Sequence, residues 1–298
     1  MSGFLDAGIY RGFDKTKQVG SIQRSNLALS GVEDLGAGVK ATFRMSARFE
    51  LGTGALEDAG AKPFWHDEAT LGLRGDWGSL RLGRALSAMW AHDWQFDPWA
   101  NFNRIASPAW QYWHALAPSD RVSNNGSAEY GRMNSGIFYD SPSVGGFVLH
   151  LSGSAERTAA AGHQGRGYSV SLNYHQGSVA AMLAHERNGS GDRASFLGGR
   201  YQWGDFALMA ALDRSRAGDS PTSARAATLG ATYTVGGTTF KAGYGRQRSS
   251  GRVTSQFASL GADYALSKRT TVYASLGHQK PKAAPSVTAF GVGLSHAF

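Results

Sequence analysis

Basic side chains alternate with apolar ones along parts of this chain. Between residues 39 and 49 the odd positions are apolar, whereas the even positions include Lys40, Arg44 and Arg48. Residues two apart in an extended strand point to the same face, so these cations would lie in a row. A row of fixed positive charges attracts anions and repels cations. The same alternation, followed along this and other strands, places further charged side chains on the polar face: Arg24, Arg74, Arg81, Arg132, Arg200 and Glu50.

Residues 85–130 hold a second group of notable side chains, which are aromatic. The tryptophans of this stretch are Trp90, Trp94, Trp99, Trp110 and Trp113. One interpretation is that these rings anchor a long segment against an inner wall, since a long loop in water needs apolar contacts. The other is that they form a platform for a cyclic or aromatic organic solute. The sequence leaves both interpretations open.

Signs of catalysis, of a metal site or of a nucleotide site are weak in this sequence. The chain has no Cys, which excludes a thiol nucleophile and zinc ribbons. It also lacks the His-Glu-x-x-His, Gly-x-Ser-x-Gly and phosphate-loop motifs. The triplet His66-Asp67-Glu68 is a poor metal motif, because neighbours in a strand point to opposite faces. We therefore expect no catalytic residues, no metal and no cofactor.

The elements that position these side chains are predicted to be β-strands. Period-two alternation recurs along the chain, for example at residues 168–174 and 227–233, and no stretch outside residues 85–130 shows a clear helical period. We predict sixteen strands, at residues 3–10, 24–32, 38–51, 66–75, 79–84, 131–140, 147–156, 167–176, 178–188, 194–203, 205–216, 224–234, 238–248, 256–265, 269–280 and 287–298.

The connections between these predicted strands are of two kinds. Every second one is long, and residues 85–130 form the longest, whereas the others are short and rich in turn residues, such as 33–37 and 235–237. Long connections at one end and tight turns at the other are typical of an outer-membrane barrel with extracellular loops and periplasmic turns. We therefore expect an all-β fold, a transmembrane antiparallel β-barrel of sixteen strands that forms one domain over residues 1–298.

Composition and charge fit this interpretation. The 298 residues contain 30 Lys and Arg against 22 Asp and Glu, a formal net charge of +8, which suggests anionic partners. Nucleic acid is disfavoured, because the basic residues alternate with apolar ones and do not form a patch. No run of about 18 apolar residues occurs, which excludes transmembrane helices. The first four residues do not resemble a signal peptide, so for an exported protein we expect that segment to be missing from this chain.

Five stretches resemble signatures of the Gram-negative trimeric porins, especially of their beta-proteobacterial branch. In chain order they are SNLALSGVEDLGAGVKA (25–41), LGLRGDWGSLRLGR (71–84), YDSPSVGGF (139–147), YALSKRT (264–270) and GVGLSHAF (291–298). The resemblance implies a homotrimer in the outer membrane, and a third loop, residues 85–130, that is folded into the lumen as a constriction. It also implies that the terminal aromatic residue, Phe298, acts as the C-terminal assembly signal.

The resemblance assigns wall residues to that constriction. Arg84 and Arg132 match basic residues of the family's barrel wall. A third wall arginine of the family corresponds to Asn26 here, and Arg24 on the same face is a possible substitute. Arg84 has the parity of the outward residue Leu82, so it reaches the lumen only if the strand bulges or ends near Gly83. On the loop, Asp97 and Asp93 resemble the acidic residues that face the wall arginines in the family.

We expect an outer-membrane porin, a water-filled channel for passive diffusion of small hydrophilic solutes that prefers anions through an arginine-lined constriction. Individual arginines could instead solvate a wide lumen or pair with loop carboxylates. The implied partners are two further copies of the chain, outer-membrane lipid and lipopolysaccharide, the outer-membrane assembly machinery and small anionic solutes. Two other classes stay open, namely a barrel enzyme, for which we find no catalytic trio, and an adhesin or receptor barrel, which would not conduct ions.

Overall fold

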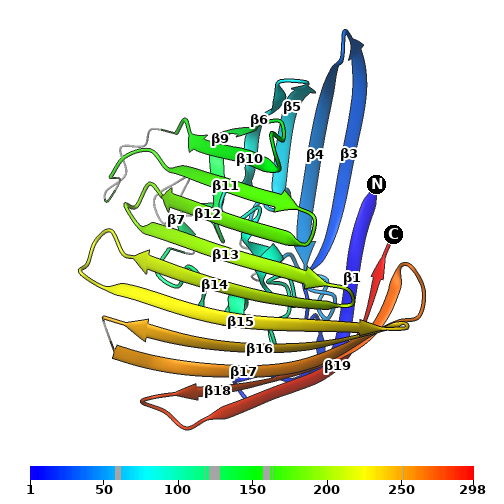
Figure 1. Ribbon diagram of the computed structural model, residues 1–298, viewed down its shortest axis with the longest axis vertical. Helices are drawn as coiled ribbons and strands as arrows, with labels where there is room; N and C mark the ends of the chain where they lie inside the picture. The colour runs from blue at the N-terminus through cyan, green and yellow to red at the C-terminus, as the bar shows by residue number, and fades with distance from the viewer. Residues whose placement is uncertain (58–61, 118, 121–127, 157–161, 163, 251) are drawn as a thin grey trace.

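The computed structural model describes residues 1–298 except 58–61, 118, 121–127, 157–161, 163 and 251. Sixteen antiparallel strands form a closed barrel, as the alternation predicts (Figure 1). They are β1 (Ser2–Arg11), β3 (Ser25–Gly36), β4 (Val39–Phe49), β5 (Glu68–Gly75), β6 (Gly78–Leu86), β9 (Arg132–Asp140), β10 (Phe147–Ser154), β11 (Tyr168–Gln176), β12 (Val179–Arg187), β13 (Arg193–Trp203), β14 (Phe206–Arg216), β15 (Ser223–Val235), β16 (Thr238–Ser249), β17 (Arg252–Ala265), β18 (Thr270–Pro281) and β19 (Val287–Ala297). The prediction of sixteen strands is confirmed, with boundaries that differ by at most four residues.

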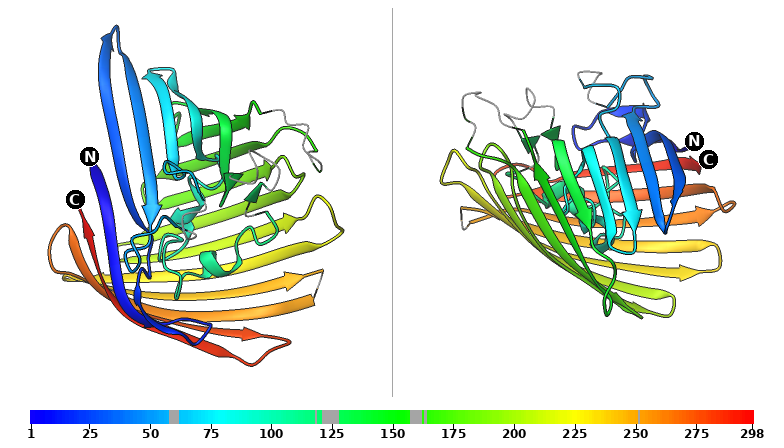
Figure 2. Two further views of the ribbon diagram at one scale, coloured as in Figure 1. Left: turned by 180° about the vertical axis from the view of Figure 1, so that it is seen from behind. Right: turned by 90° about the horizontal axis from the view of Figure 1, so that it is seen from above.

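The barrel closes where the two ends of the chain meet. Strand β1 pairs with β19, and the backbone N–H of Gly3 donates to the carbonyl of Phe298 at 3.0 Å. Figure 2 shows the two termini side by side. The short strand β2 (Lys17–Gly20) pairs with the far end of β1. The sequence did not predict β2, because four residues are too few to show alternation.

Small elements occupy the long connection between β6 and β9. They are the 3-10 turn η1 (Asp93–Phe96), the helix α1 (Pro108–Tyr112) and a two-residue pair, β7 (Ser119–Asp120) with β8 (Ala128–Glu129). Figure 2 shows η1 and α1 on the concave side of the sheet. In the part of the chain that the structure describes, no helix is long and apolar enough to cross a membrane.

The barrel wall exposes its large apolar side chains on the outside and keeps small and polar ones on the inside, which is the reverse of a soluble protein. Along β14, Leu208 and Leu212 are exposed, whereas Ala207 and Asp213 on the other face are buried. Exposed leucines recur on β12, β13, β15 and β17. Alternation with apolar residues outside is typical of a membrane barrel. We call the face with the exposed leucines the outer face and the opposite one the inner face.

Aromatic residues gather on the outer face next to the short turns. Directly paired rings follow one another around the barrel: Trp203 opposite Phe206, Phe206 opposite Tyr233, and Tyr233 opposite Phe240. The Phe206 and Tyr233 ring centroids are 5.7 Å apart. Such girdles mark a membrane–water interface in outer-membrane barrels.

One turn differs from its predicted position. We predicted the turn at residues 33–37, but β3 continues to Gly36, and Asp34 still pairs with Lys40 of β4. The reversal is made by Gly36, Ala37 and Gly38, all of which have positive φ. Asp34 Oδ1 accepts a hydrogen bond from the Gly36 N–H at 2.9 Å and thereby stabilises this tighter turn.

Candidate functional site

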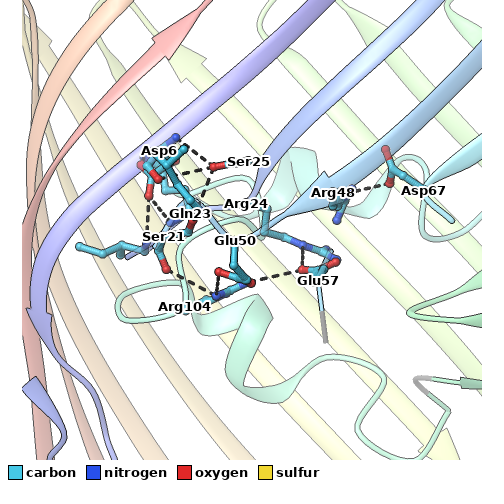
Figure 3. A network of polar contacts seen from close by, with 12 residues as sticks. Asp6, Ser21, Gln23, Arg24, Ser25, Arg48, Glu50, Glu57, Asp67 and Arg104 are labelled. Atoms are coloured by element: carbon cyan, nitrogen blue, oxygen red, sulfur yellow. Dashed lines mark hydrogen bonds and ion pairs between the residues drawn. The ribbon is translucent and has the colours of Figure 1, made fainter. Parts of the chain in front are cut away.

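Arginines and carboxylates form an ion-pair network on the inner face near the start of β3 (Figure 3). Arg24 binds Glu57 in a bidentate manner, because its Nε and Nη2 each lie 2.8 Å from one carboxylate oxygen. Glu57 comes from the connection after β4, and both side chains are buried. Paired, fork-shaped hydrogen bonds of this kind fix both partners in orientation as well as in distance.

A second carboxylate, Asp67, holds two further arginines. Arg48 Nε lies 2.8 Å from Asp67 Oδ1. Arg132 contacts the same oxygen through Nη2, and its Nε donates to the Asp67 carbonyl at 2.9 Å. Ser46 donates to the other carboxylate oxygen at 2.7 Å. One buried aspartate therefore joins strands β4 and β9 at the point where β5 begins.

Among the described side chains, the long connection contributes a cation to this network and no anion. Arg104 contacts Glu50 with both Nη atoms and lies 3.4 Å from Glu57. Its backbone N–H also donates to the carbonyl of Ile22 at 3.0 Å. The loop is thus attached to the wall by an arginine that reaches wall carboxylates.

Arg84 lies next to this network because β6 bulges. The register between β6 and β9 shifts between Gly83 and Ala85, and Gly83 has a φ of 128°. The shift turns Arg84 to the inner face, although Leu82 before it is exposed. Arg84 Nε donates to the carbonyl of His66 at 2.6 Å, and its Nη1 contacts Asn134. We define the arginine cluster as Arg24, Arg48, Arg84, Arg104 and Arg132.

Among the described residues, four guanidinium groups of this cluster bind three carboxylates, Glu50, Glu57 and Asp67. The fifth, that of Arg84, binds the His66 carbonyl and Asn134. Burial alone would raise the pKa of the Glu57 carboxyl, but Arg24, Arg48 and Arg104 hold that pKa far below its ordinary value. Glu57 is therefore ionised at every physiological pH. The cluster keeps a surplus of positive charge even with all of its carboxylates ionised.

The other predicted basic residues lie elsewhere on the wall. Arg44 pairs with Glu68 at 3.2 Å, and Arg81 bridges Glu68 at 3.1 Å and Asp140 at 3.4 Å. Lys40 and Arg74 are direct neighbours across β4 and β5, close to the short turns, and Arg74 is exposed. These four do not belong to the arginine cluster.

The predicted acidic residues of the loop are turned toward the loop and the opposite wall. Asp97 accepts hydrogen bonds from the backbone N–H groups of Trp99, Asn101 and Ala109 at 2.9, 3.1 and 3.2 Å. Asp93 lies 2.8 Å from His114. The structure therefore does not place Asp93 and Asp97 against the arginines. Both are held by other residues of the same loop, and they organise it.

His114 attaches the loop to β14. It is fully buried, with Nε2 2.8 Å from Asp93 and Nδ1 2.7 Å from Asp213. Burial alone would lower the pKa of His114, but the Asp213 and Asp93 carboxylates raise it to about 10. The imidazolium thus stabilises the loop fully at pH values below the ordinary histidine pKa, and this contribution is lost as the pH rises through about 10.

We therefore expect alkaline pH to loosen this attachment. Trp90 packs against His114 in a tilted arrangement with ring centroids 4.5 Å apart, so its emission reports on the contact. The emission difference between the parent and His114→Gln, followed from pH 7 to 11, should change with a midpoint near 10. Taking the difference removes the titration of tyrosines, which both proteins share. A difference that stays flat over this range would contradict a charged His114.

The five tryptophans are not equivalent. Trp99 and Trp113 are buried, and Trp113 Nε1 donates to Thr228 at 3.2 Å. Trp94 is 44% exposed. Trp110 is half-buried, and the guanidinium carbons of Arg24 and Arg104 lie 5.3 and 5.8 Å from its ring centre. A cavity of about 360 Å³ lies between wall and loop residues, and it is lined by Arg24, Arg48, Trp90, Trp94, Trp110 and Tyr130, among others.

Glycines on the inner face make room for the loop. Gly198, Gly230, Gly243, Gly261 and Gly277 belong to five different strands, and each faces a loop residue. A Cβ atom at Gly277 would lie 2.0 Å from the Ile105 carbonyl oxygen, and one at Gly230 would lie 2.5 Å from the Pro98 ring. Direct hydrogen bonds reinforce this contact, such as that from the Tyr112 hydroxyl to Ser255 at 2.7 Å.

Comparison with known proteins decides the family. The family model described as Gram-negative porin matches residues 1–284. The chain belongs to the Gram-negative porin family. It is therefore a channel protein of the outer membrane and not an enzyme.

Individual relatives agree with this assignment. Outer membrane porin protein 32 of Delftia acidovorans is 28% identical over 322 residues, which cover 92% of this chain and 84% of that protein. Major outer membrane protein P.IB of Neisseria meningitidis is 27% identical over 300 residues, with 92% and 83% covered. Among solved structures, the anion-selective porin from Comamonas acidovorans superposes with a TM-score of 0.86 at 24% identity, covering 100% of this chain and 98% of that one.

The residues of the ion-pair network that sequence reasoning missed are Glu57, Asp67 and Arg104. Asp67 was weighed only as part of a poor metal motif. Glu57 and Arg104 lie in connections, where no periodicity indicates a direction. The inner-face glycines are the sequence signal that could have located the loop, because glycine in a strand interior often marks close approach of another segment.

A further histidine cluster links the loop of this porin to its wall. His92 stacks on His150 with ring centroids 3.7 Å apart, and His150 Nδ1 lies 2.8 Å from Asp140. Burial, together with His150, lowers the pKa of His92 to about 4, so its ring is neutral at pH 7. The three groups have the residue types of a metal site, and their ligand atoms lie within 4.8 Å of one another. Arg81 already pairs with Asp140, which opposes binding of a second cation there, so we assign the cluster to loop attachment.

Proposed function

We propose that this porin forms a water-filled, anion-preferring channel whose constriction lies between the arginine cluster and the inserted loop, in a single barrel domain over residues 1–298. Small hydrophilic anions would pass beside the guanidinium groups. The observation that carries the proposal is the charge balance of the cluster, which gathers five guanidinium groups, four of them bound to a total of three carboxylates, on the inner side of the barrel. Fixed charge in a narrow passage with low-dielectric walls acts strongly on permeating ions.

The position of the loop supports this proposal. Residues between Ser87 and Ala117 contact inner-face residues of six strands from β13 to β18, including Phe196, Thr228, Ser255 and Ser275. The loop therefore packs on the wall formed by β13 to β18, and it reaches the arginine side through Arg104 and Trp110. The structural relative from Comamonas acidovorans is described as anion-selective, which is consistent with the proposed preference.

Of the two interpretations of the tryptophans, anchoring accounts for more of the rings. Trp99 and Trp113 are buried against the wall, and Trp110 lies against Arg24 and Arg104. Cation–π contacts of this kind hold a guanidinium in place. We propose that the aromatic rings shape the passage and orient its arginines, and that they are not a platform for cyclic solutes.

The assembly proposals rest on relatives and on the resemblance. One Vibrio cholerae outer membrane protein, OmpT, has been solved in a trimer form, and it superposes on this chain with a TM-score of 0.70 at 15% identity. We propose that this porin is likewise a homotrimer in outer-membrane lipid and lipopolysaccharide. We further propose that Phe298 on the final strand is the residue that the assembly machinery recognises.

The proposed function is tested by ion conduction. The purified protein, inserted into a planar bilayer under a potassium chloride gradient, should conduct, and its zero-current potential should have the sign of chloride preference. Potassium preference would contradict the proposed role of the cluster. Absence of conductance would favour a plugged barrel or an adhesin.

A further inference from the structure

Arginines cover part of the outer face, where lipid-facing side chains are expected to be apolar. We define the arginine band as the exposed residues Arg193, Arg214, Arg216, Arg225, Arg246 and Arg248. They lie on the neighbouring strands β13 to β16, at the ends opposite the turns 204–205 and 236–237 (Figure 1). Each shares its face with exposed leucines such as Leu197, Leu212 and Leu229.

Strand register places five of these arginines directly opposite one another. Arg193 pairs with Arg216, Arg214 with Arg225, and Arg225 with Arg248. Like charges directly opposite across antiparallel strands repel and destabilise the sheet. Among the described residues, no ion pair involves any member of the band. An anionic partner outside the chain would therefore relieve the repulsion within the arginine band.

The surrounding carboxylates do not neutralise the band. Residues 193–252 contain three acidic residues: Asp205, Asp213 and Asp219. Asp213 is buried on the inner face, where it binds His114, and Asp205 lies in the turn at the opposite end of the barrel. Asp219, in the connection after β14, is the exposed carboxylate on the side of the band. The band therefore keeps a large excess of positive charge.

The height of the band matches one boundary of the membrane. On three strands an arginine of the band and an aromatic residue of the girdle are eight positions apart: Arg214 and Phe206, Arg225 and Tyr233, Arg248 and Phe240. Eight residues span about 26 Å of strand, or about 20 Å along the axis of a barrel with strands tilted by about 40°. The girdle lies beside the short periplasmic turns. The band therefore lies at the headgroups of the outer leaflet.

A groove leads from the band into the apolar belt. Its upper part, about 610 Å³, is lined by Arg214, Arg225, Arg246 and Arg248 above Leu197 and Leu212. A second part shares Leu197, Leu212 and Arg246 with it, and a third continues along Ala210, Leu229 and Tyr244. The floor is formed by small residues, such as Gly199, Ala227 and Ala242. Cations above an apolar channel match a lipid with an anionic headgroup.

We propose that the arginine band and this groove bind one lipid of the outer leaflet, of the kind that carries several acyl chains and more than one phosphate. The phosphates lie over the arginine ladder and remove its repulsion, and an acyl chain follows the groove. Arginine suits this role because its planar fork binds phosphate in a bidentate manner. The proposal adds a specific lipid site to the proposed function, and it relies on the membrane orientation but not on anion preference.

The test compares two matched double variants of the full-length porin, purified in a neutral detergent. Arg225→Gln/Arg248→Gln removes two paired arginines of the groove, and Lys268→Gln/Arg269→Gln removes two basic residues from the turn at the opposite end. Binding is measured with diphosphorylated lipid A, with its dephosphorylated form and with inorganic phosphate. The parent and the turn variant should bind diphosphorylated lipid A equally, and the band variant about 25-fold more weakly, since each arginine near a lipid phosphate contributes about a fivefold effect.

Thermal unfolding separates this site from a merely structural role. Without lipid, the band variant should unfold at the same or a higher temperature than the parent, because a repulsion is removed. With diphosphorylated lipid A, the parent should gain more stability than the band variant. Equal binding by parent and band variant, equal binding of the dephosphorylated lipid, or equal protection by inorganic phosphate would each overturn the proposal. Conductance serves as the separate readout of the channel, and we expect it to be unchanged in both variants.

Discussion

Glu57→Ala should make the channel more anion-preferring and at the same time less stable. The substitution removes the carboxylate that neutralises Arg24, so the surplus charge of the arginine cluster increases by one. It also leaves a buried guanidinium without its bidentate partner, since the side chains of Arg24 and Glu57 are 9% and 5% exposed. Removing one partner of a buried pair costs about 3 to 5 kcal/mol of unfolding free energy. The zero-current potential should therefore shift toward stronger chloride preference, and the urea midpoint should fall.

The control for Glu57→Ala is the double variant Arg24→Ala/Glu57→Ala. It removes both partners, so no buried charge of this pair is left alone, and Arg104 keeps its contact with Glu50. The double variant should recover much of the stability that the single variant loses, and it should return the surplus charge of the cluster to the parent's value. Equal stability of Glu57→Ala and the parent would show that the pair contributes nothing measurable.

Gly83→Ala should disrupt the bulge that turns Arg84 inward. Gly83 has a φ of 128°, which side chains with a Cβ rarely adopt, and an added Cβ would lie 2.1 Å from the Ala69 carbonyl oxygen. Strain and overlap together should cost about 2 to 5 kcal/mol. Relief by loss of the bulge would move Arg84 toward lipid, which is also unfavourable. We expect a lower yield of folded barrel and a lower urea midpoint.

Gly199→Ala is the matched control for Gly83→Ala. Gly199 also lies in a strand, but no atom lies within 4 Å of the position that its Cβ would take. This control should fold like the parent. If Gly83→Ala folds as well as Gly199→Ala and keeps its urea midpoint, the bulge does not depend on glycine and our explanation of the position of Arg84 fails.

The strands could be predicted because alternation is a local property. Each strand carries its own apolar and polar faces, and the short turns carry glycine. Residues 206–216 can therefore be recognised as a strand from their own pattern, without knowledge of the neighbouring strands. The parity of Arg44 and Arg48 follows from the same pattern. Arg84 is the instructive exception, because its parity points outward and only a bulge at Gly83 explains its burial.

The partners of the arginines could not be predicted in the same way. Ion pairs between Arg24 and Glu57, or between Arg104 and Glu50, join residues far apart in the sequence, and no periodic signal marks them. The acidic residues of the loop were expected at the constriction through resemblance. In the structure, Asp97 accepts three backbone hydrogen bonds from its own loop. The short side chain of an aspartate commonly accepts hydrogen bonds from nearby backbone N–H groups, and it is then not available to a distant arginine.

The most direct test of the arginine cluster is the zero-current potential of Arg24→Gln/Arg48→Gln beside the parent, under the same potassium chloride gradient. Both arginines line the cavity between cluster and loop. The variant Lys268→Gln/Arg269→Gln, which loses the same charge at an exposed turn, is the control. We predict chloride preference in the parent and in the control, and a permeability ratio at least about twofold closer to unity or reversed in Arg24→Gln/Arg48→Gln. An unchanged chloride preference in that variant would contradict selection by the cluster.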